Sequence, residues 1–232
     1  MTALAASSID FLAELAANNN KEWFASQRER YEAAKADVVR FAGAVLDEIT
    51  AFDACIPPEL PAKQCVLRLH RDVRFSKNKL PYKSNFGIGI SRFGSKFVEP
   101  GYYVHIAPNE CFIGGGWWCP APAALHAIRQ TVAEQGERLQ RLIAEPDFLA
   151  AFGGLDTGEA LKTAPKGYAK DHPRIALLKL KSFTASRPLP PGFYCQADAA
   201  QQIGRQFAAL RPLIDFLRQA SALAPDTMPG GR

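Results

Sequence analysis

Hydrophobic residues recur at helical spacing near both ends of the chain and alternate with polar residues in between. Ser8 caps a first predicted helix that carries Ile9, Leu12 and Leu15 and stops at the asparagines 18–20. A second helix is predicted over 28–49, where one side is apolar: Tyr31, Ala34, Val38, Phe41, Val45 and Ile49. Further helices are predicted after Pro120 and Pro122 and after the capping pattern that begins at Asp198.

The middle of the chain alternates with the period of a β-strand. Runs of this kind cover residues 67–75, 86–90, 102–106 and 111–113, joined by short loops, and a later strand is predicted over 178–184. Short consecutive runs with short loops are typical of an antiparallel meander. We therefore predict an α+β fold: a mostly antiparallel sheet, with a central meander plus a later strand, packed with N-terminal, middle and C-terminal helices.

Length and composition predict one domain. The chain has 232 residues, 47% of them hydrophobic, and no repeat or linker divides it. We expect a single domain over 1–223 and a flexible tail over 224–232. The N-terminus does not resemble a signal peptide, no stretch is apolar enough to span a bilayer, and the five cysteines form no pairwise motif. These features favour reduced thiols in a cytoplasmic protein.

The excess positive charge is concentrated in residues 68–83. This segment holds six basic residues and one acid, Asp72, which gives it a net charge of +5, the same as that of the whole chain. Basic and acidic residues therefore cancel in the remainder. Such a concentration is typical of an anion-binding site, although basic residues on a half-exposed strand are also commonly just its solvated face.

In the predicted strand the polar residues Arg68, His70, Asp72 and Arg74 share one face, whereas Arg71 falls among the apolar positions. We expect Gly87, Gly89 and Ser91 to form a shallow floor beside this face, with Tyr103 and His105 next to it. His70 or His105 is the candidate acid or base, and Asp72 the residue that orients a histidine or an arginine. The candidate ligand contacts of this segment are Arg68, Arg71, Arg74, Lys77, Lys79, Tyr82 and Lys83, the last four on a loop that can close over an anion.

Two further stretches are candidates for ligand contact. Backbone amides of the glycine run around Gly115 can cradle an oxyanion and Trp117 can stack on a ring, or the run is a strand end whose tryptophan fills the core. Lys166, Tyr168 and His172 can reach the same face, although His172 is also explained as part of a helix cap before Pro173.

Several familiar motifs are missing from the sequence. It has only four histidines, far apart, and neither a His-Glu-x-x-His motif, a nucleotide-binding P-loop nor a Gly-x-Ser-x-Gly elbow. We therefore predict no metal and no cofactor, and no reaction class follows.

Five stretches together resemble the bacterial domain-of-unknown-function family 2461. They are residues 19–24 (NNKEWF), 71–83 (RDVRFSKNKLPYK), 101–105 (GYYVH), 114–117 (GGGW) and 165–168 (PKGY) with 171–173 (DHP). The resemblance covers nearly the full chain and implies a single-domain, soluble bacterial protein. It implies no activity. It does imply that the basic segment, the glycine run and the Pro-Lys-Gly-Tyr loop occur together.

Two functions are compatible with these features. The first is a site for an anionic small molecule that carries a phosphate or carboxylate. A protein with such a site can be an enzyme or a binding protein. The second is a nucleic-acid-binding module, with the basic strand and loop on phosphates and Trp117 or Tyr103 stacking on bases. A scaffold whose basic face meets an acidic partner is the third. We favour the small molecule because the charge is compact; the oligomeric state does not follow from the sequence.

Overall fold

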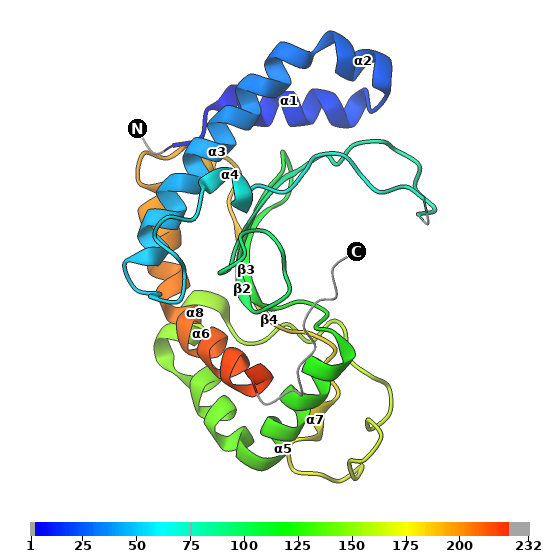
Figure 1. The fold of residues 1–232 in the computed structure, drawn as a ribbon, viewed down its shortest axis with the longest axis vertical. Helices are drawn as coiled ribbons and strands as arrows, with labels where there is room; N and C mark the ends of the chain where they lie inside the picture. Colours follow the sequence, from blue (N-terminus) through cyan, green and yellow to red (C-terminus); the bar gives the residue numbers. More distant parts are fainter. Residues whose placement is uncertain (1–2, 75, 223–232) are drawn as a thin grey trace. The chain divides into compact units, whose positions relative to one another are not determined.

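A computed structural model describes residues 3–74 and 76–222 of the chain (Figure 1). Its elements follow one another as α1 (Ala6–Ala17), α2 (Lys21–Ser26), α3 (Arg28–Thr50), α4 (Ala62–Cys65), β1 (Phe86–Ile90), β2 (Gly101–Ile106), β3 (Cys111–Trp117), α5 (Pro122–Ala144), α6 (Pro146–Phe152), α7 (Ile175–Leu178), β4 (Phe183–Leu189), the 3₁₀ turn η1 (Phe193–Cys195) and α8 (Ala199–Ala222).

The four strands form one antiparallel sheet in the order β1-β2-β3-β4. In the β1–β2 pair, Gly87 lies opposite His105 and Gly89 opposite Tyr103, while Ile88 lies opposite Val104. Because strand side chains alternate between faces, the glycines, Tyr103 and His105 share one face and the aliphatic residues share the other. This confirms the predicted α+β class and the antiparallel meander.

Contacts group the described residues into two compact units. The first comprises 3–74, 76–96, Tyr102–Ile113 and Pro188–Ala208, and the second comprises Phe97–Gly101, Gly114–Arg187 and 209–222. The prediction of one domain over 1–223 stays a prediction, and the predicted tail, 224–232, lies outside the described residues.

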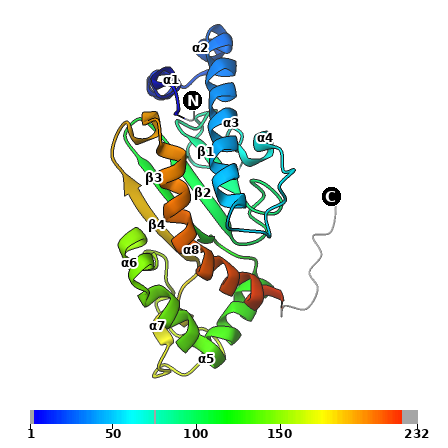
Figure 2. The same ribbon diagram turned by 90° about the vertical axis from the view of Figure 1, so that its left-hand side faces the viewer.

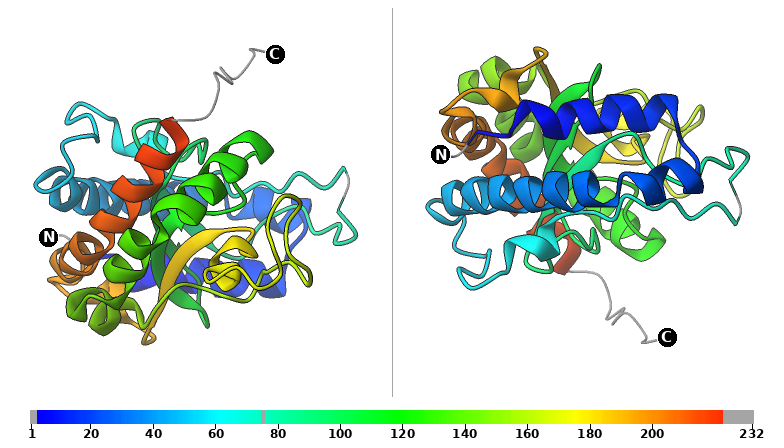
Figure 3. Two further views of the ribbon diagram at one scale, coloured as in Figure 1. Left: turned by 90° about the horizontal axis from the view of Figure 1, so that it is seen from below. Right: turned by 90° about the horizontal axis from the view of Figure 1, so that it is seen from above.

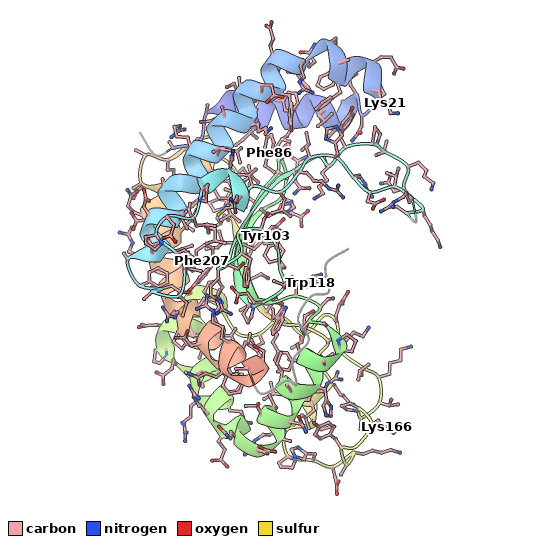
Figure 4. The ribbon with its side chains drawn as sticks, in the orientation of Figure 1. Lys21, Phe86, Tyr103, Trp118, Lys166 and Phe207 are labelled. Carbon is pink, nitrogen blue, oxygen red and sulfur yellow. The ribbon has the colours of Figure 1, made fainter. Side chains whose placement is uncertain are left out.

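In the first unit, α3 and the first part of α8 cover the aliphatic face of the sheet (Figure 2). Tyr102 is fully buried on this face, between the rings of Phe52 and Phe207, and its hydroxyl donates to the buried Asp53 at 2.9 Å. Tyr103, the next residue, therefore projects from the opposite face (Figure 4). Burial of the aliphatic and aromatic side chains on the helix-covered face is the main stabilising contribution to this unit.

Helices α1 and α3 lie side by side in the first unit, joined through the short α2 (Figure 3). Asn20 begins α2, because its Oδ1 accepts from the backbone N–H of Trp23 at 2.9 Å. Phe11, Phe24 and Tyr31 bring their rings together between the helices. The two predicted helices of the N-terminal third are thus present. The predicted cap at Ser8 is wrong, because α1 already begins at Ala6 and the buried Ser8 donates through Oγ to Asp37.

In the second unit, α5 is interrupted at Gln135, whose φ of −123° and ψ of 20° are not helical. Arg174 lies across this break: it donates to the carbonyl of Ala133 at 3.1 Å and to Glu137 at 3.0 Å. A Cβ at Gly136 would lie 2.2 Å from the Cδ of Arg174, so only glycine leaves room for this arginine. The helix predicted from the apolar pattern is present, with a break that the pattern does not indicate.

Two predicted strands differ from the structure. Residues 66–74 form no strand: they make single antiparallel bridges, from Val66 to Ile88 and from His70 to Tyr82, and Phe75 lies outside the described residues. Leu178 ends helix α7, and β4 starts only at Phe183 and extends through Pro188 to Leu189. Proline lacks a backbone donor, and it is tolerated in β4 because β4 is an edge strand.

Candidate anion-binding site

Residues 66–74 and 76–85 of the first unit run out from the sheet and back as a narrow arm below α2 in Figure 1. At the centre of the arm, Arg71 N–H donates to the carbonyl of Pro81 at 2.9 Å and Lys83 N–H donates to the carbonyl of Leu69 at 2.8 Å. His70 and Tyr82 lie opposite each other between these bonds. Their side chains therefore share one face of the arm, and those of Arg71 and Lys83 share the other.

Asn19 holds the arm against the N-terminal helices. Its Nδ2 donates to the carbonyl of Tyr82 at 3.0 Å, and its Oδ1 accepts from the N–H of the same residue at 3.1 Å. The buried Tyr82 ring stacks on Phe24, with centroids 4.0 Å apart and planes 16° from parallel. The Asn-Asn-Lys-Glu-Trp-Phe and Leu-Pro-Tyr-Lys stretches are thus parts of one local structure.

Tyr103 and His105 form a pair on the open face of the sheet. The hydroxyl of Tyr103 lies 3.1 Å from Nδ1 of His105, and the His105 ring stacks on Phe112, with centroids 4.6 Å apart. The buried Tyr194 hydroxyl lies 2.8 Å from the carbonyl oxygen of His105 and thereby anchors this part of β2. The positions of Tyr103 and His105 on one face agree with the predicted alternation.

The space above Gly87, predicted as a shallow floor for a ligand, is filled by the side chains of Tyr103 and Leu67. A Cβ at Gly87 would lie 2.9 Å from the Tyr103 hydroxyl and 3.4 Å from Cδ1 of Leu67. Leu67, rather than Arg68, is therefore the residue of the basic segment that meets this face. The N–H of Leu67 donates to the carbonyl of Gly87 at 2.9 Å, which sets this register. A change of one residue in register moves every side chain to the other face, so the predicted facing of Arg68, His70, Asp72 and Arg74 onto the glycines differs from the structure.

The electrostatics link the arm to the Tyr103–His105 pair. Burial lowers the pKa of Lys83, and the positive charges of Arg68 and Arg71 lower it further. Burial also lowers the pKa of His105; Glu110 acts in the opposite direction, and the Lys83 charge adds to the lowering. Burial, with Glu110, raises the pKa of Tyr103 to about 12. The Lys83 charge thus acts at His105, where the carboxylate of Glu110 opposes it.

The other polar residues of the arm have different partners. Arg74 donates through Nε and Nη2 to the two carboxylate oxygens of Asp72, at 3.0 and 2.7 Å, and both side chains are exposed. These bonds lower the pKa of Asp72. His70 lies edge-on to Phe24 and Tyr82, with centroids 5.8 and 5.0 Å away. Within residues 3–74 and 76–222 no contact joins His70 to His105.

Two hollows border the arm on the side of α2. One, of about 470 Å³, is lined by Lys21, Phe24, Ala25, Arg28, His70 and Tyr82. The other, of about 620 Å³, is lined by Asn19, Asn20, Lys21, Glu22, Lys77, Asn78, Lys79, Leu80 and Pro81. Lys77 and Lys79, predicted as part of a closing loop, thus line a hollow with α2, and Lys79 Nζ donates to the carbonyl of Val73 at 3.0 Å.

The glycine run and the Pro-Lys-Gly-Tyr loop belong to the second unit. A Cβ at Gly114 would lie 2.7 Å from the Ala185 carbonyl oxygen, and one at Gly116, whose φ is +107°, would lie 2.1 Å from that of Phe183. Gly115 is buried in β3, and Trp117 is 5% exposed. Pairing with β4 and core packing therefore account for Gly114, Gly116 and Trp117, which is the structural alternative set out for this run.

In the Pro-Lys-Gly-Tyr loop, Lys166 is exposed, and the rings of Tyr168 and His172 lie edge-on, 6.4 Å apart. Nδ1 of His172 accepts from the N–H of Arg174 at 3.1 Å, just before α7. His172 thus helps to form the turn that leads into this helix, close to the cap predicted for this position.

Sequence reasoning missed several residues that shape the site: Asn19, Lys21, Glu110, Phe112 and Tyr194. Phe112 and Glu110 had a local signal, since they lie just beyond the turn after β2. The role of Asn19 depends on Tyr82, 63 positions away, and no local pattern indicates such a pairing. Among the described residues, no cluster of histidine, cysteine, aspartate and glutamate is arranged to hold a metal.

The fold and the site define an α+β protein with a basic arm folded against its N-terminal helices. The chain belongs to the family described as conserved hypothetical protein (DUF2461), whose model matches residues 7–216. Comparison with curated proteins and with solved structures gave no match. No helix within 3–74 and 76–222 is long and apolar enough to cross a membrane.

Proposed function

We propose that the protein binds an anionic small molecule, carrying a phosphate or carboxylate group, on the side of the arm that presents Arg71 and Lys83. The observation that carries this proposal is the pairing of the arm, which places these two side chains on one face through the bonds from Arg71 to Pro81 and from Lys83 to Leu69. Within the described residues, neither they nor Arg68 form an ion pair. A bound anion would supply the missing negative charge.

The chemistry of the cluster fits an oxyanion. Arginine offers a planar pair of donors and lysine a compact charge, and both bind carboxylate and phosphate oxygens. His105 adds a ring nitrogen: Nδ1 is engaged by Tyr103, so Nε2 is the nitrogen left for a ligand. Of the residues predicted for acid–base chemistry, we retain His105, because His70 packs on Phe24 and Tyr82 and Asp72 pairs with Arg74.

The cytoplasm is the location we propose for this activity, on the basis of the cysteine pattern of the sequence.

The proposal is tested by titrating phosphate, nucleotides and dicarboxylates while following thermal unfolding, followed by calorimetry of any compound that stabilises the protein. Replacement of both Arg71→Gln and Lys83→Gln should weaken binding at least about tenfold, because a hydrogen bond to a charged group contributes roughly 1.5–3 kcal/mol. The matched control replaces the exposed Lys63→Gln and Lys96→Gln, which changes the net charge equally and should leave binding intact. If no compound stabilises the wild type more than the Arg71/Lys83 variant, the proposal fails.

A further inference from the structure

The larger of the two hollows borders α2 and shares no lining residue with the Arg71–Lys83 face. It measures about 620 Å³ and lies between the start of α2 and residues 77–81 of the arm. We call it the Lys21 hollow, after the labelled residue in Figure 4. Its volume is in the range of small-molecule sites, a few hundred to about 1,000 Å³.

The asparagines of the Lys21 hollow are oriented by backbone bonds. Oδ1 of Asn20 accepts from the N–H of Trp23 at 2.9 Å, and Oδ1 of Asn78 accepts from the N–H of Leu80 at 3.0 Å. A planar amide whose oxygen is engaged by the backbone presents its Nδ2 group on the other side. In the described part of the chain neither Nδ2 has a protein partner, so both asparagines offer donors.

The charged side chains of the hollow also provide hydrogen-bond donors for an anion. Lys21, Lys77 and Lys79 line the hollow against a single acid, Glu22, which gives a formal charge of +2. Within the described residues, Lys21 and Lys77 form no ion pair, and Lys79 uses one of its three donors on the Val73 carbonyl. Asn19 lines the hollow without a role in ligand recognition, since its Nδ2 and its Oδ1 are both hydrogen-bonded to the backbone of Tyr82. Leu80 and Pro81 supply an apolar side.

We infer that the Lys21 hollow binds a phosphate monoester of a hydroxyl-bearing molecule, a sugar phosphate or a nucleotide. A phosphate monoester carries a charge of about −1.5 to −2 at pH 7 and three strong acceptor oxygens, which match a donor-rich lining of formal charge +2. Glu22, the only carboxylate of the lining, supplies acceptor oxygens for a hydroxyl group of the same ligand. This site is separate from the Arg71–Lys83 face and does not rest on the function proposed for it.

The test uses the full chain and calorimetric titration with ribose 5-phosphate, adenosine monophosphate and ribose. Asn20→Asp keeps the oxygen that caps Trp23, because aspartate caps helices as well as asparagine, and Asn78→Asp keeps the turn at Leu80. Each substitution replaces a donor of the hollow by a negatively charged acceptor. We expect each to weaken binding of ribose 5-phosphate about tenfold or more, with the unfolding midpoint nearly unchanged.

Two controls locate the ligand. Asn109→Asp adds the same negative charge at an exposed turn of the first unit and should leave the affinity within about twofold, since exposed charges at a distance are screened by salt. The double change Arg71→Gln with Lys83→Gln should also leave this affinity in place. A tighter complex with adenosine monophosphate would indicate a nucleotide, and equal affinities a sugar phosphate; either result supports the inference.

The inference is overturned if neither phosphate ester binds the wild type, or if ribose binds as well as ribose 5-phosphate. It is also overturned if Asn109→Asp weakens binding as much as Asn20→Asp. Loss of binding in the Arg71/Lys83 variant with retention in both asparagine variants would place the ligand at Arg71 and Lys83 and reject the hollow.

Discussion

The basic arm and the glycine run of β3 are both composed of residues typical of anion sites, and the structure uses them in opposite ways. In the arm, the hydrogen bonds of Arg71 and Lys83 to the opposite stretch are made by backbone groups, so their side chains are left available to a ligand. In the glycine run, the close approach of β4 occupies the space that a ligand would need at Gly114 and Gly116. The difference shows that residue type alone does not define a site. What matters is which groups remain available once the backbone is paired.

The largest effect that would test this comparison is expected at Gly116. Gly116→Ala places a Cβ 2.1 Å from the Phe183 carbonyl oxygen at a φ of +107°, so backbone strain and overlap add up. We expect a loss of about 3 kcal/mol or more in the free energy of unfolding, measured in denaturant. Gly158→Ala is the matched control, because no atom lies within 4 Å of the added Cβ. A Gly116→Ala protein as stable as the control would show that β3 and β4 do not need this glycine.

A smaller effect is expected at Asn19, which holds the centre of the arm. Asn19→Ala removes both partners of the Tyr82 backbone and should cost about 2 kcal/mol, because it leaves a buried N–H and a buried C=O unsatisfied. Denaturant unfolding gives the value, and Asn109→Ala, at an exposed turn, is the control that should change it little. Because Asn19 holds the arm, the same variant should also bind anions more weakly. Unchanged stability and binding would contradict a structural role for this amide.

The smallest effect concerns the dependence of stability on pH. Because the pKa of His105 is lower in the folded chain than its ordinary value of 6.5, the unfolded chain binds the proton more readily. The stabilisation is therefore fully present above pH 6.5 and is lost as the pH falls from there through the lowered pKa. Denaturant unfolding between pH 7.5 and about 5 should show a steeper loss in the wild type than in His105→Asn. The exposed His126→Asn should retain the wild-type slope, and equal slopes in all three proteins would argue against a half-buried His105 that is held neutral.

Much of the fold follows from local patterns. The apolar stripe predicted over 28–49 is α3, Arg28–Thr50, and the alternation over 86–90 is β1. These elements were predictable because their periodicity extends over enough residues to define a buried side. The sharp change from α7 to β4 was not, since Leu178 and Phe183 belong to one apolar run that is compatible with a helix or a strand.

The concentration of positive charge at the candidate site could be predicted from the sequence. The arrangement of its side chains in space could not. The alternation correctly placed His70 and Arg71 on opposite faces of the segment. What each face contacts, however, depends on backbone hydrogen bonds such as those from Leu67 to Gly87 and from Lys83 to Leu69. Such bonds join distant residues, and a shift of one position would reverse both faces. The Lys21 hollow was missed for the same reason, because α2 and the arm form it together.

The pair of bonds between Asn19 and Tyr82 has one more consequence. In the arm, the N–H and C=O of Tyr82 point away from the neighbouring chain stretch, as they do on the outer edge of any narrow ribbon. Exposed edges of this kind recruit strands from other molecules and promote aggregation. The amide of Asn19 mimics a single peptide unit of an adjacent strand and closes the edge at this position. Asn19 thus lets a protruding, highly charged ribbon remain accessible to ligands while blocking the addition of a strand there.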